Sequence, residues 1–158
     1  MSEHGSRFWH AAYRYQYRIL ALIDPLVRVV WRRFGIGNVV DLEVARRIGS
    51  GSRSRLVGLL HAQGRIYVGH PNGDVGWTRD LNAAGAGVVH YHNGATWLFE
   101  ATQLPHDAER EAVIRSTGQH PFPGNLMYRL GRGHIRVVGV FFRLTDRQAA
   151  GDSEGAPV

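Results

Sequence analysis

Residues 39–69 read VVDLEVARRIGSGSRSRLVGLLHAQGRIYVG, and this stretch decides the fold class. Val40, Leu42 and Val44 alternate with polar or small residues, which is the period-two pattern of a half-buried strand. The residues that follow predict a turn at 46–55, a strand at 55–60, a hairpin connection at 61–64 and a strand at 65–69. Short strands joined by tight turns indicate a mainly β domain with antiparallel pairing.

The rest of the chain continues this pattern. Asn93-Gly94, the strongest short hairpin signal, separates two strand-like segments at 87–92 and 95–104. Further elements are expected as helices at 77–84 and 105–117, an irregular segment at 118–133 and a last strand at 135–144. About six antiparallel strands with two inserted helices predict a mainly β (α+β) split β-barrel, with an α+β sandwich as the alternative.

The N-terminal segment is rich in aromatic residues and arginine. We expect one helix over 8–23 and a second that begins at Pro25 with Asp24 as its N-cap. The segment matches neither a signal peptide nor a membrane span. A helix on an anionic membrane surface, a helix on its own domain and a helix against a partner subunit are the alternatives. The expected organisation is a helical segment at 1–38, a barrel domain at 39–147 and a disordered tail at 148–158.

Composition narrows the function classes. The chain has 158 residues, no cysteine and no lysine, and all 19 of its basic residues are arginine. Disulfides, cysteine zinc sites and Schiff-base lysines are therefore excluded, and a cytoplasmic location fits. The formal charge of +6 suits a phosphorylated cofactor, an anionic membrane surface or nucleic acid. Because the chain lacks a recognition helix and an aromatic stacking motif, no nucleic-acid partner is expected.

Arginine and glycine gather in the predicted turn at 46–55. Arg47, Arg53 and Arg55 surround Gly49, whose missing side chain lets backbone N–H groups approach an anion. Guanidinium groups bind phosphate and carboxylate through paired hydrogen bonds. The turn is a candidate phosphate site, and an exposed basic turn is the alternative.

A second candidate site lies at the start of the predicted helix 77–84. Asn72 and Gly73 form a turn that leads to Trp77, and helix N-termini attract anions. Trp77 could stack on a flat ring, and Arg79 could reach a phosphate or a carboxylate. The alternative role for Trp77 is that of a core residue.

Histidines and one shaped loop give the remaining candidates. His90 and His92 share a strand face, but no acidic ligand accompanies them and we expect no metal site. His120 and Tyr128 lie among prolines and glycines in residues 117–130, where a loop can present polar groups over a pocket. The chain shows no Ser–His–Asp order and no carboxylate pair, which disfavours a hydrolase.

These motifs, in this order, resemble the flavin and deazaflavin oxidoreductases of split β-barrel fold, and most nearly the deazaflavin-dependent nitroreductase and quinone-reductase family. The resemblance covers about residues 39–104 and, more loosely, the closing segment VVGVFFRLTD. That family carries an Arg-Lys-x-Gly-x-x-Arg turn. Here Arg47 and Arg53 stand at its arginine positions, and Ile48 replaces the basic residue between them.

The family then has a Gly-rich loop that leads to a Trp-x-x-Asn-Leu helix. Asn72-Gly73 and the helix beginning at Trp77 are similar to it, with a shorter loop and with Asp80 in place of the asparagine. The two departures concern the cofactor site more than the fold. A side branch of the family with another cofactor, or with none, is therefore the alternative.

The resemblance implies a reductase that uses 8-hydroxy-5-deazaflavin (coenzyme F-420), or alternatively FMN, and passes a hydride to a quinone-like, nitroaromatic or lipid-derived acceptor. The residues expected to hold the cofactor are Arg47, Gly49, Arg53, Arg55, Asn72, Gly73, Trp77 and Arg79. His120 or Tyr128 would give a proton to the acceptor. A homodimer, and peripheral attachment to the inner face of the cell membrane, are further expectations. The competing hypothesis is a non-catalytic small-ligand or lipid-binding barrel at the membrane surface.

Overall fold

The computed structural model describes residues 3–147 except residue 74, and side chains from residue 7 onward. The strands are β1 (Val39–Ala45), β2 (Ser52–Gly58), β3 (Leu60–Ala62), β4 (Arg65–His70), β5 (Ala86–His90), β6 (Thr96–Gln103) and β7 (Val140–Asp146). The helices are α1 (Glu3–Phe34), α2 (Gly76–Ala84), α3 (Ala108–Ser116), α4 (Gly124–Leu130) and α5 (Arg132–Val138), with a short 3₁₀ turn at Thr117–Gln119. The tail expected at 148–158 lies outside the described residues.

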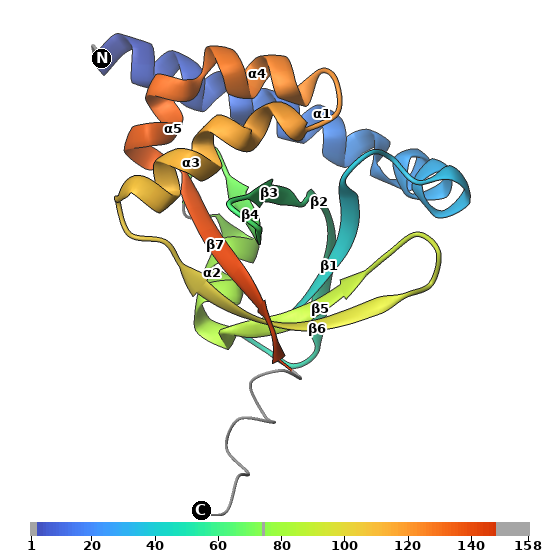
Figure 1. Ribbon diagram of the computed structural model, residues 1–158. Coiled ribbons are helices and arrows are strands. Elements are labelled where there is room, and N and C mark those ends of the chain that lie inside the picture. Colours follow the sequence, from blue (N-terminus) through green and yellow to red (C-terminus); the bar gives the residue numbers. More distant parts are fainter. Residues whose placement is uncertain (1–2, 74, 148–158) are drawn as a thin grey trace, which may run out of the picture.

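All seven strands form one antiparallel sheet in the order β2-β1-β5-β6-β7-β4-β3. The two ends of this order, β2 and β3, are separated in the chain by Leu59 alone. The Leu59 N–H donates to the carbonyl oxygen of Asn38 at 2.9 Å, which fixes this crossing beside the start of β1. The sheet curls into a barrel that stays open between β2 and β3 (Figure 1), which confirms the expected split β-barrel class.

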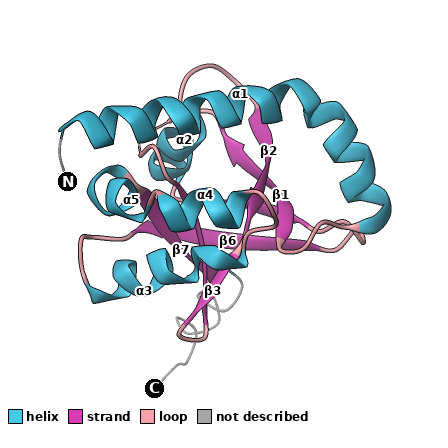
Figure 2. Cartoon of the chain, turned by 90° about the horizontal axis from the view of Figure 1, so that it is seen from above, coloured by secondary structure: helices cyan, strands magenta, loops and turns pink. Residues whose placement is uncertain are grey.

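The helices cover two different parts of the sheet. In Figures 1 and 2, α1, α3, α4 and α5 lie together across one end, and Figure 1 shows α2 apart from them. Trp77 and Leu81 of α2 are buried with Leu42 and Val44 of β1 inside the barrel. A second cluster joins the helical layer to the sheet through buried residues that include Tyr13, Tyr128, Ile135 and Phe141.

The N-terminal segment is a single helix, not the two that we expected. Pro25 lies inside α1 rather than in the first turn of a new helix. Proline removes one backbone hydrogen bond and bends a helix without having to end it, and α1 changes direction toward its C-terminal end in Figure 2. Past the bend, Trp31 is buried and its Nε1–H donates to the Val39 carbonyl at 2.8 Å. Among the described residues, no helix has both the length and the apolar content needed to cross a bilayer.

Local signals predicted several elements correctly. β1 begins and ends as expected, β5 and β6 pair around Asn93-Gly94, and α2 ends at Gly85 in the left-handed conformation with φ of 64°. The strand expected at 55–60 is instead β2 followed by the short β3, so the sheet has seven strands rather than about six.

The C-terminal half departs most from the expectation. The segment expected to be irregular at 118–133 contains α4 and the start of α5, and the last strand begins at Val140 instead of Ile135. The reason is a buried guanidinium. Arg110 of α3 donates to the carbonyl oxygens of Ile135, Arg136 and Gly139 at 3.1, 3.0 and 2.6 Å. These bonds add a charged donor to carbonyl oxygens at and just after the end of the helix, so α5 can end inside the protein.

Candidate functional site

The helix α2 positions the candidate site. Its first turn is closed by Thr78, whose side-chain oxygen accepts the Val75 N–H at 2.9 Å. Trp77 and Leu81 anchor one face of the helix in the barrel. The opposite side therefore carries Arg79 and Asn82 toward the turn that follows β1.

The Arg/Gly turn between β1 and β2 is tied to α2 by one carboxylate. Gly49 and Gly51 have φ of 83° and 91°, which lets the chain reverse within six residues. The backbone N–H of Arg47 donates to Asp80 Oδ1 at 3.2 Å, and the Arg53 guanidinium lies 3.5 Å from Asp80 Oδ2. Asp80, which stands where the resembling family has asparagine, thus holds two of the predicted cofactor residues against α2.

A cavity of about 420 Å³ lies beside α2 and the Arg/Gly turn. Its polar wall comprises Arg47, Thr78, Arg79, Asn82 and Gln103, and its apolar wall includes Val140 and Phe142. A volume of a few hundred cubic ångströms is typical of small-molecule pockets. We call it the α2 cavity. Its two arginines and two amides suit an anionic group such as phosphate.

Two further predicted arginines lie along β2. Arg53 and Arg55 pair with Val44 and Leu42 of β1, so their side chains leave the strand on the face that looks into the barrel. The Arg53 guanidinium packs at the start of α2, since a Cβ added to Gly76 would lie 2.8 Å from Arg53 Nη1. Arg55 is exposed, yet its charge helps to lower the pKa of His70. Arg47, Arg53 and Arg79 thus gather around α2, while Arg55 faces another cluster.

Contacts within the fold account for the residue types at positions 72, 73 and 77. Asn72 Nδ2 donates to the His10 carbonyl at 3.0 Å, and its Oδ1 lies 2.9 Å from His134 Nε2. Gly73 has φ of 73°, and a Cβ there would collide with the Val138 carbonyl. Trp77 is only 6% exposed. Asn72 and Gly73 therefore join the loop before α2 to α1 and α5, and Trp77 packs inside the barrel.

His120 and Tyr128 lie together, on the side of the molecule covered by α1 and α4. Their ring centroids are 4.4 Å apart, and neither residue lines the α2 cavity. The Tyr128 hydroxyl oxygen lies 3.3 Å from that of Tyr17, whose ring in turn lies 4.5 Å from the His70 ring. The structure therefore brings the two predicted proton donors to one another but not to the gathered arginines.

Burial sets the protonation of this cluster. Desolvation lowers the pKa of His70 to about 3 and that of His120 to about 4, so both imidazoles are neutral near pH 7. Desolvation likewise raises the pKa of Tyr17 to about 12 and that of Tyr128 well above its usual value. Near neutral pH the Tyr128 hydroxyl therefore keeps its proton, and the His120 imidazole is not protonated to an imidazolium.

Sequence reasoning missed both side-chain amides of the α2 cavity. Asn82 follows Arg79 by three positions on the same helix, a spacing that places both on one face and could have been noticed. Gln103 comes from the end of β6 and reaches the cavity through the pairing of β6 with β7. Only the sheet order reveals it.

His90 is the last residue of β5, and His92 lies in the turn beyond it, so the two do not share a strand face as expected. The hydrogen bond from Ser52, and next the contact of Oε2 with His90 Nε2 at 2.8 Å, lower the pKa of Glu43. No three potential metal ligands of the His, Cys, Asp or Glu type come together anywhere in the part of the chain that the structure describes.

Comparison with known proteins identifies the architecture. The heme storage protein HutZ from Vibrio cholerae is similar to this chain with a TM-score of 0.51 and 15% sequence identity, over 79% of this chain and 90% of HutZ. The fold is a split β-barrel. A protein of unknown function from Agrobacterium tumefaciens, Atu2129, gives a TM-score of 0.51 at 12% identity, over 77% of this chain and 54% of that one. A candidate pyridoxamine 5'-phosphate oxidase from Listeria innocua gives 0.49 at 10% identity, over 80% and 94%. No family model and no curated protein matches the sequence.

Proposed function

We propose that the protein is an oxidoreductase that binds a phosphorylated flavin-type cofactor in the α2 cavity, with coenzyme F-420 as the first candidate and FMN as the second. The observation that carries the proposal is the position of Arg47 and Arg79 on one cavity, together with the side-chain amides of Asn82 and Gln103. The sequence resemblance to deazaflavin-dependent reductases supports it. The split β-barrel architecture is compatible with it.

The residues present fit the anionic part of such a cofactor. Arg47 and Arg79 would bind phosphate oxygens, and the side-chain amides of Asn82 and Gln103 would add neutral hydrogen bonds. Val140 and Phe142 give the cavity an apolar wall that would exclude water from the bound group.

When bound, the cofactor would supply hydride transfer to a quinone-like, nitroaromatic or lipid-derived acceptor. The protein's own task is to orient the cofactor and to provide a proton. Tyr128 keeps its hydroxyl proton at neutral pH, but the hydroxyl group points to Tyr17. The role of Tyr128 or His120 as proton donor stays a prediction.

Cofactor titration tests the proposal. Purified protein is titrated with F-420 and with FMN while ligand fluorescence is followed. We expect saturable binding of at least one cofactor, and Arg47→Gln and Arg79→Gln should each weaken it about 10-fold or more, because a charge-assisted hydrogen bond contributes about 1.5–3 kcal/mol. Arg129→Gln, on an exposed position of α4, is the control and should bind as the wild type does. Failure of both cofactors to bind would overturn the oxidoreductase proposal.

We also propose that the protein is a homodimer with the cofactor at the subunit interface, an arrangement implied by the resemblance. A cofactor larger than the α2 cavity would then be covered by the second subunit. Sedimentation velocity at micromolar concentration should give a dimer, with or without cofactor. A monomer under both conditions would contradict this part of the proposal.

The second candidate function is a non-catalytic lipid-binding barrel. The specific observation in its favour is the outer face of α1, where large apolar side chains such as Phe8, Leu22 and Leu26 are exposed. Cofactor binding separates the two candidates, because only the oxidoreductase requires it.

A further inference from the structure

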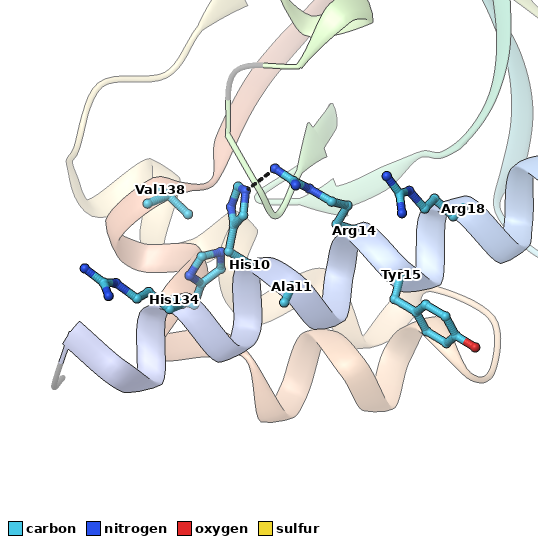
Figure 3. A pocket seen from close by; sticks show the side chains of 8 residues that line it. His10, Ala11, Arg14, Tyr15, Arg18, His134 and Val138 are labelled. Atoms are coloured by element: carbon cyan, nitrogen blue, oxygen red, sulfur yellow. Dashed lines mark hydrogen bonds between the residues drawn. The ribbon is translucent and has the colours of Figure 1, made fainter.

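A second cavity, of about 610 Å³, opens between α1 and α5 and belongs to neither proposed function (Figure 3). Arg7, Arg14 and Arg18 line it from α1. Seven residues make nearly two helical turns and eleven make slightly more than three, so these arginines lie within about 40° of one another around the axis. Ala11 occupies the place between the first two and leaves open space there. We call this cavity the α1 pocket.

The walls of the α1 pocket are held in place by hydrogen bonds. His134 and Val138 of α5 form the wall opposite the arginines. Asn72 spans the two helices, since its Nδ2 donates to the His10 carbonyl and its Oδ1 lies 2.9 Å from His134 Nε2. Because the Nδ2 contact orients the amide, Asn72 Oδ1 accepts a hydrogen bond from the Nε2–H of His134. The two walls are thus fixed before any ligand arrives.

The described side chains that line the α1 pocket carry positive charge from three arginines. Within the described residues, other arginines such as Arg28 and Arg136 pair with carboxylates, but Arg7, Arg14 and Arg18 do not. Arg14 Nη2 lies 3.3 Å from His10 Nε2, and arginine can only donate, so this contact cancels no charge. Uncompensated guanidinium groups around a concave site attract an anion, above all a phosphate.

An apolar stripe lies next to the arginines on the same helix. Phe8, Tyr15, Ile19 and Leu22 are all exposed, Leu22 to 82% and Tyr15 to 69%. Their spacing centres them about 90° around the helix axis from the arginine line. Figure 3 shows Tyr15 projecting away from Arg14 and Arg18. A helix that carries cations beside an exposed apolar face suits the boundary between lipid headgroups and acyl chains.

We propose that the α1 pocket binds the phosphate group of an anionic phospholipid while the apolar stripe of α1 enters the adjacent membrane interface. A soluble anion would account for the arginines but leave the exposed Tyr15 and Leu22 without a partner. A lipid accounts for both. The proposal does not depend on the oxidoreductase activity, because the α1 pocket and the α2 cavity share no lining residue.

Vesicle flotation of the full chain tests the site. The vesicles contain phosphatidylcholine alone or phosphatidylcholine with phosphatidylglycerol. We expect the wild type to float only with the anionic vesicles. An arginine near an anionic surface strengthens binding about fivefold, so Arg14→Gln/Arg18→Gln should weaken it about 25-fold. The control Arg115→Gln/Arg129→Gln removes the same charge from exposed positions of α3 and α4 and should change binding at most about twofold.

A second pair of variants tests the apolar stripe. Leu22→Gln should reduce flotation, whereas Leu130→Gln, which replaces an exposed leucine of α4, should not. Circular dichroism verifies that each variant folds. Equal loss in the pocket and control arginine variants would show mere charge attraction and overturn the site, as would equal flotation with neutral vesicles or none with anionic ones. Binding of soluble glycerol phosphate that depends on Arg14 and Arg18, without flotation, would overturn the lipid in favour of a soluble anion.

Discussion

The hydroxyl oxygens of Tyr17 and Tyr128 lie 3.3 Å apart, although 111 residues separate them in the chain. Tyr128 is only 5% exposed, and Tyr17 covers it from α1. This polar contact lies within an otherwise aromatic cluster, where Tyr128 also meets the rings of Tyr13 and His120. It fixes how α1 rests on α4, and therefore the orientation of the whole N-terminal helix.

Removal of the Tyr17 hydroxyl should destabilise the fold. Tyr17→Phe leaves the Tyr128 hydroxyl buried without this partner, which costs about 1–3 kcal/mol in the free energy of unfolding. The double variant Tyr17→Phe/Tyr128→Phe should lose less than the sum of the single losses, because neither group is then left unpaired. Urea unfolding measures all three. The control Tyr15→Phe, on an exposed side chain, should stay within about 0.5 kcal/mol of the wild type, and strict additivity would contradict the contact.

Stability should fall as the pH drops below neutrality. The folded pKa values of His70 and His120, about 3 and about 4, lie below the ordinary value of 6.5. The unfolded chain therefore binds these protons first, and each histidine costs up to about 1.4 kcal/mol per pH unit between pH 6.5 and its folded pKa. Carboxylates such as Glu109, whose pKa is lowered chiefly by the Tyr67 hydroxyl, add to this slope only below about 4.5.

The variant His120→Gln isolates one contribution to this pH dependence. It should flatten the stability profile between pH 6.5 and 4.5, whereas His106→Gln, at an exposed position before α3, should leave the profile unchanged. Guanidinium chloride unfolding at several pH values gives the profile. The same slope in both variants would contradict the burial of His120 as its cause.

The close approach at Gly73 makes a sharp test of the loop before α2. Gly73→Ala should cost clearly more stability than Gly94→Ala. Both glycines have positive φ, 73° and 87°, so both substitutions carry about 1–2 kcal/mol of backbone strain. Only at Gly73 would the added Cβ also meet the carbonyl of Val138, whereas Gly94 has open space. Equal melting temperatures for the two variants would show that the loop can move away from α5.

Substitution of Asp80 tests its place beside the cofactor. Asp80→Asn keeps an oxygen for the Arg47 N–H but removes the charge that pairs with Arg53. A phosphorylated cofactor in the α2 cavity should then bind several-fold more tightly at low salt, since one nearby negative charge is gone. The fluorescence titration described above measures this, with Asp146→Asn as the control. Weaker binding by Asp80→Asn would indicate that its charge positions Arg53 rather than competes with the ligand.

Local patterns predicted those elements whose cause is local. β1 follows from alternation, the β5–β6 hairpin from Asn93-Gly94, and the end of α2 from Gly85. The helix α5 could not be predicted in this way, because Ile135–Val138 has the composition of a strand. Its end depends on Arg110, 25 or more residues away, whose guanidinium donates to the carbonyls of Ile135, Arg136 and Gly139.

The candidate site was predictable in its residue types but not in its assembly. The Arg/Gly turn and Arg79 were evident from the sequence, yet their common cavity depends on the insertion of α2 beside β1. The same fold places His120 and Tyr128 on the other side, although the resemblance had implied that they serve the same site as the arginines. Gln103 reaches the α2 cavity only because β6 pairs with β7.

The long-range contacts of α1 also affect the order of events during synthesis. The Tyr13 hydroxyl donates a hydrogen bond to the carbonyl of Met127, which lies 114 positions later in the chain. The Tyr17 hydroxyl contacts that of Tyr128, 111 positions later. Ribosomes add about 5–20 residues per second, so the finished α1 stands without its docking partners for roughly 6–20 s. During that interval the aromatic side chains that will later be buried are exposed beside the apolar stripe. The nascent helix therefore exposes the most apolar surface before the barrel has folded. A chaperone or a membrane encountered at that stage could contact both the apolar stripe and the aromatic face that is later buried.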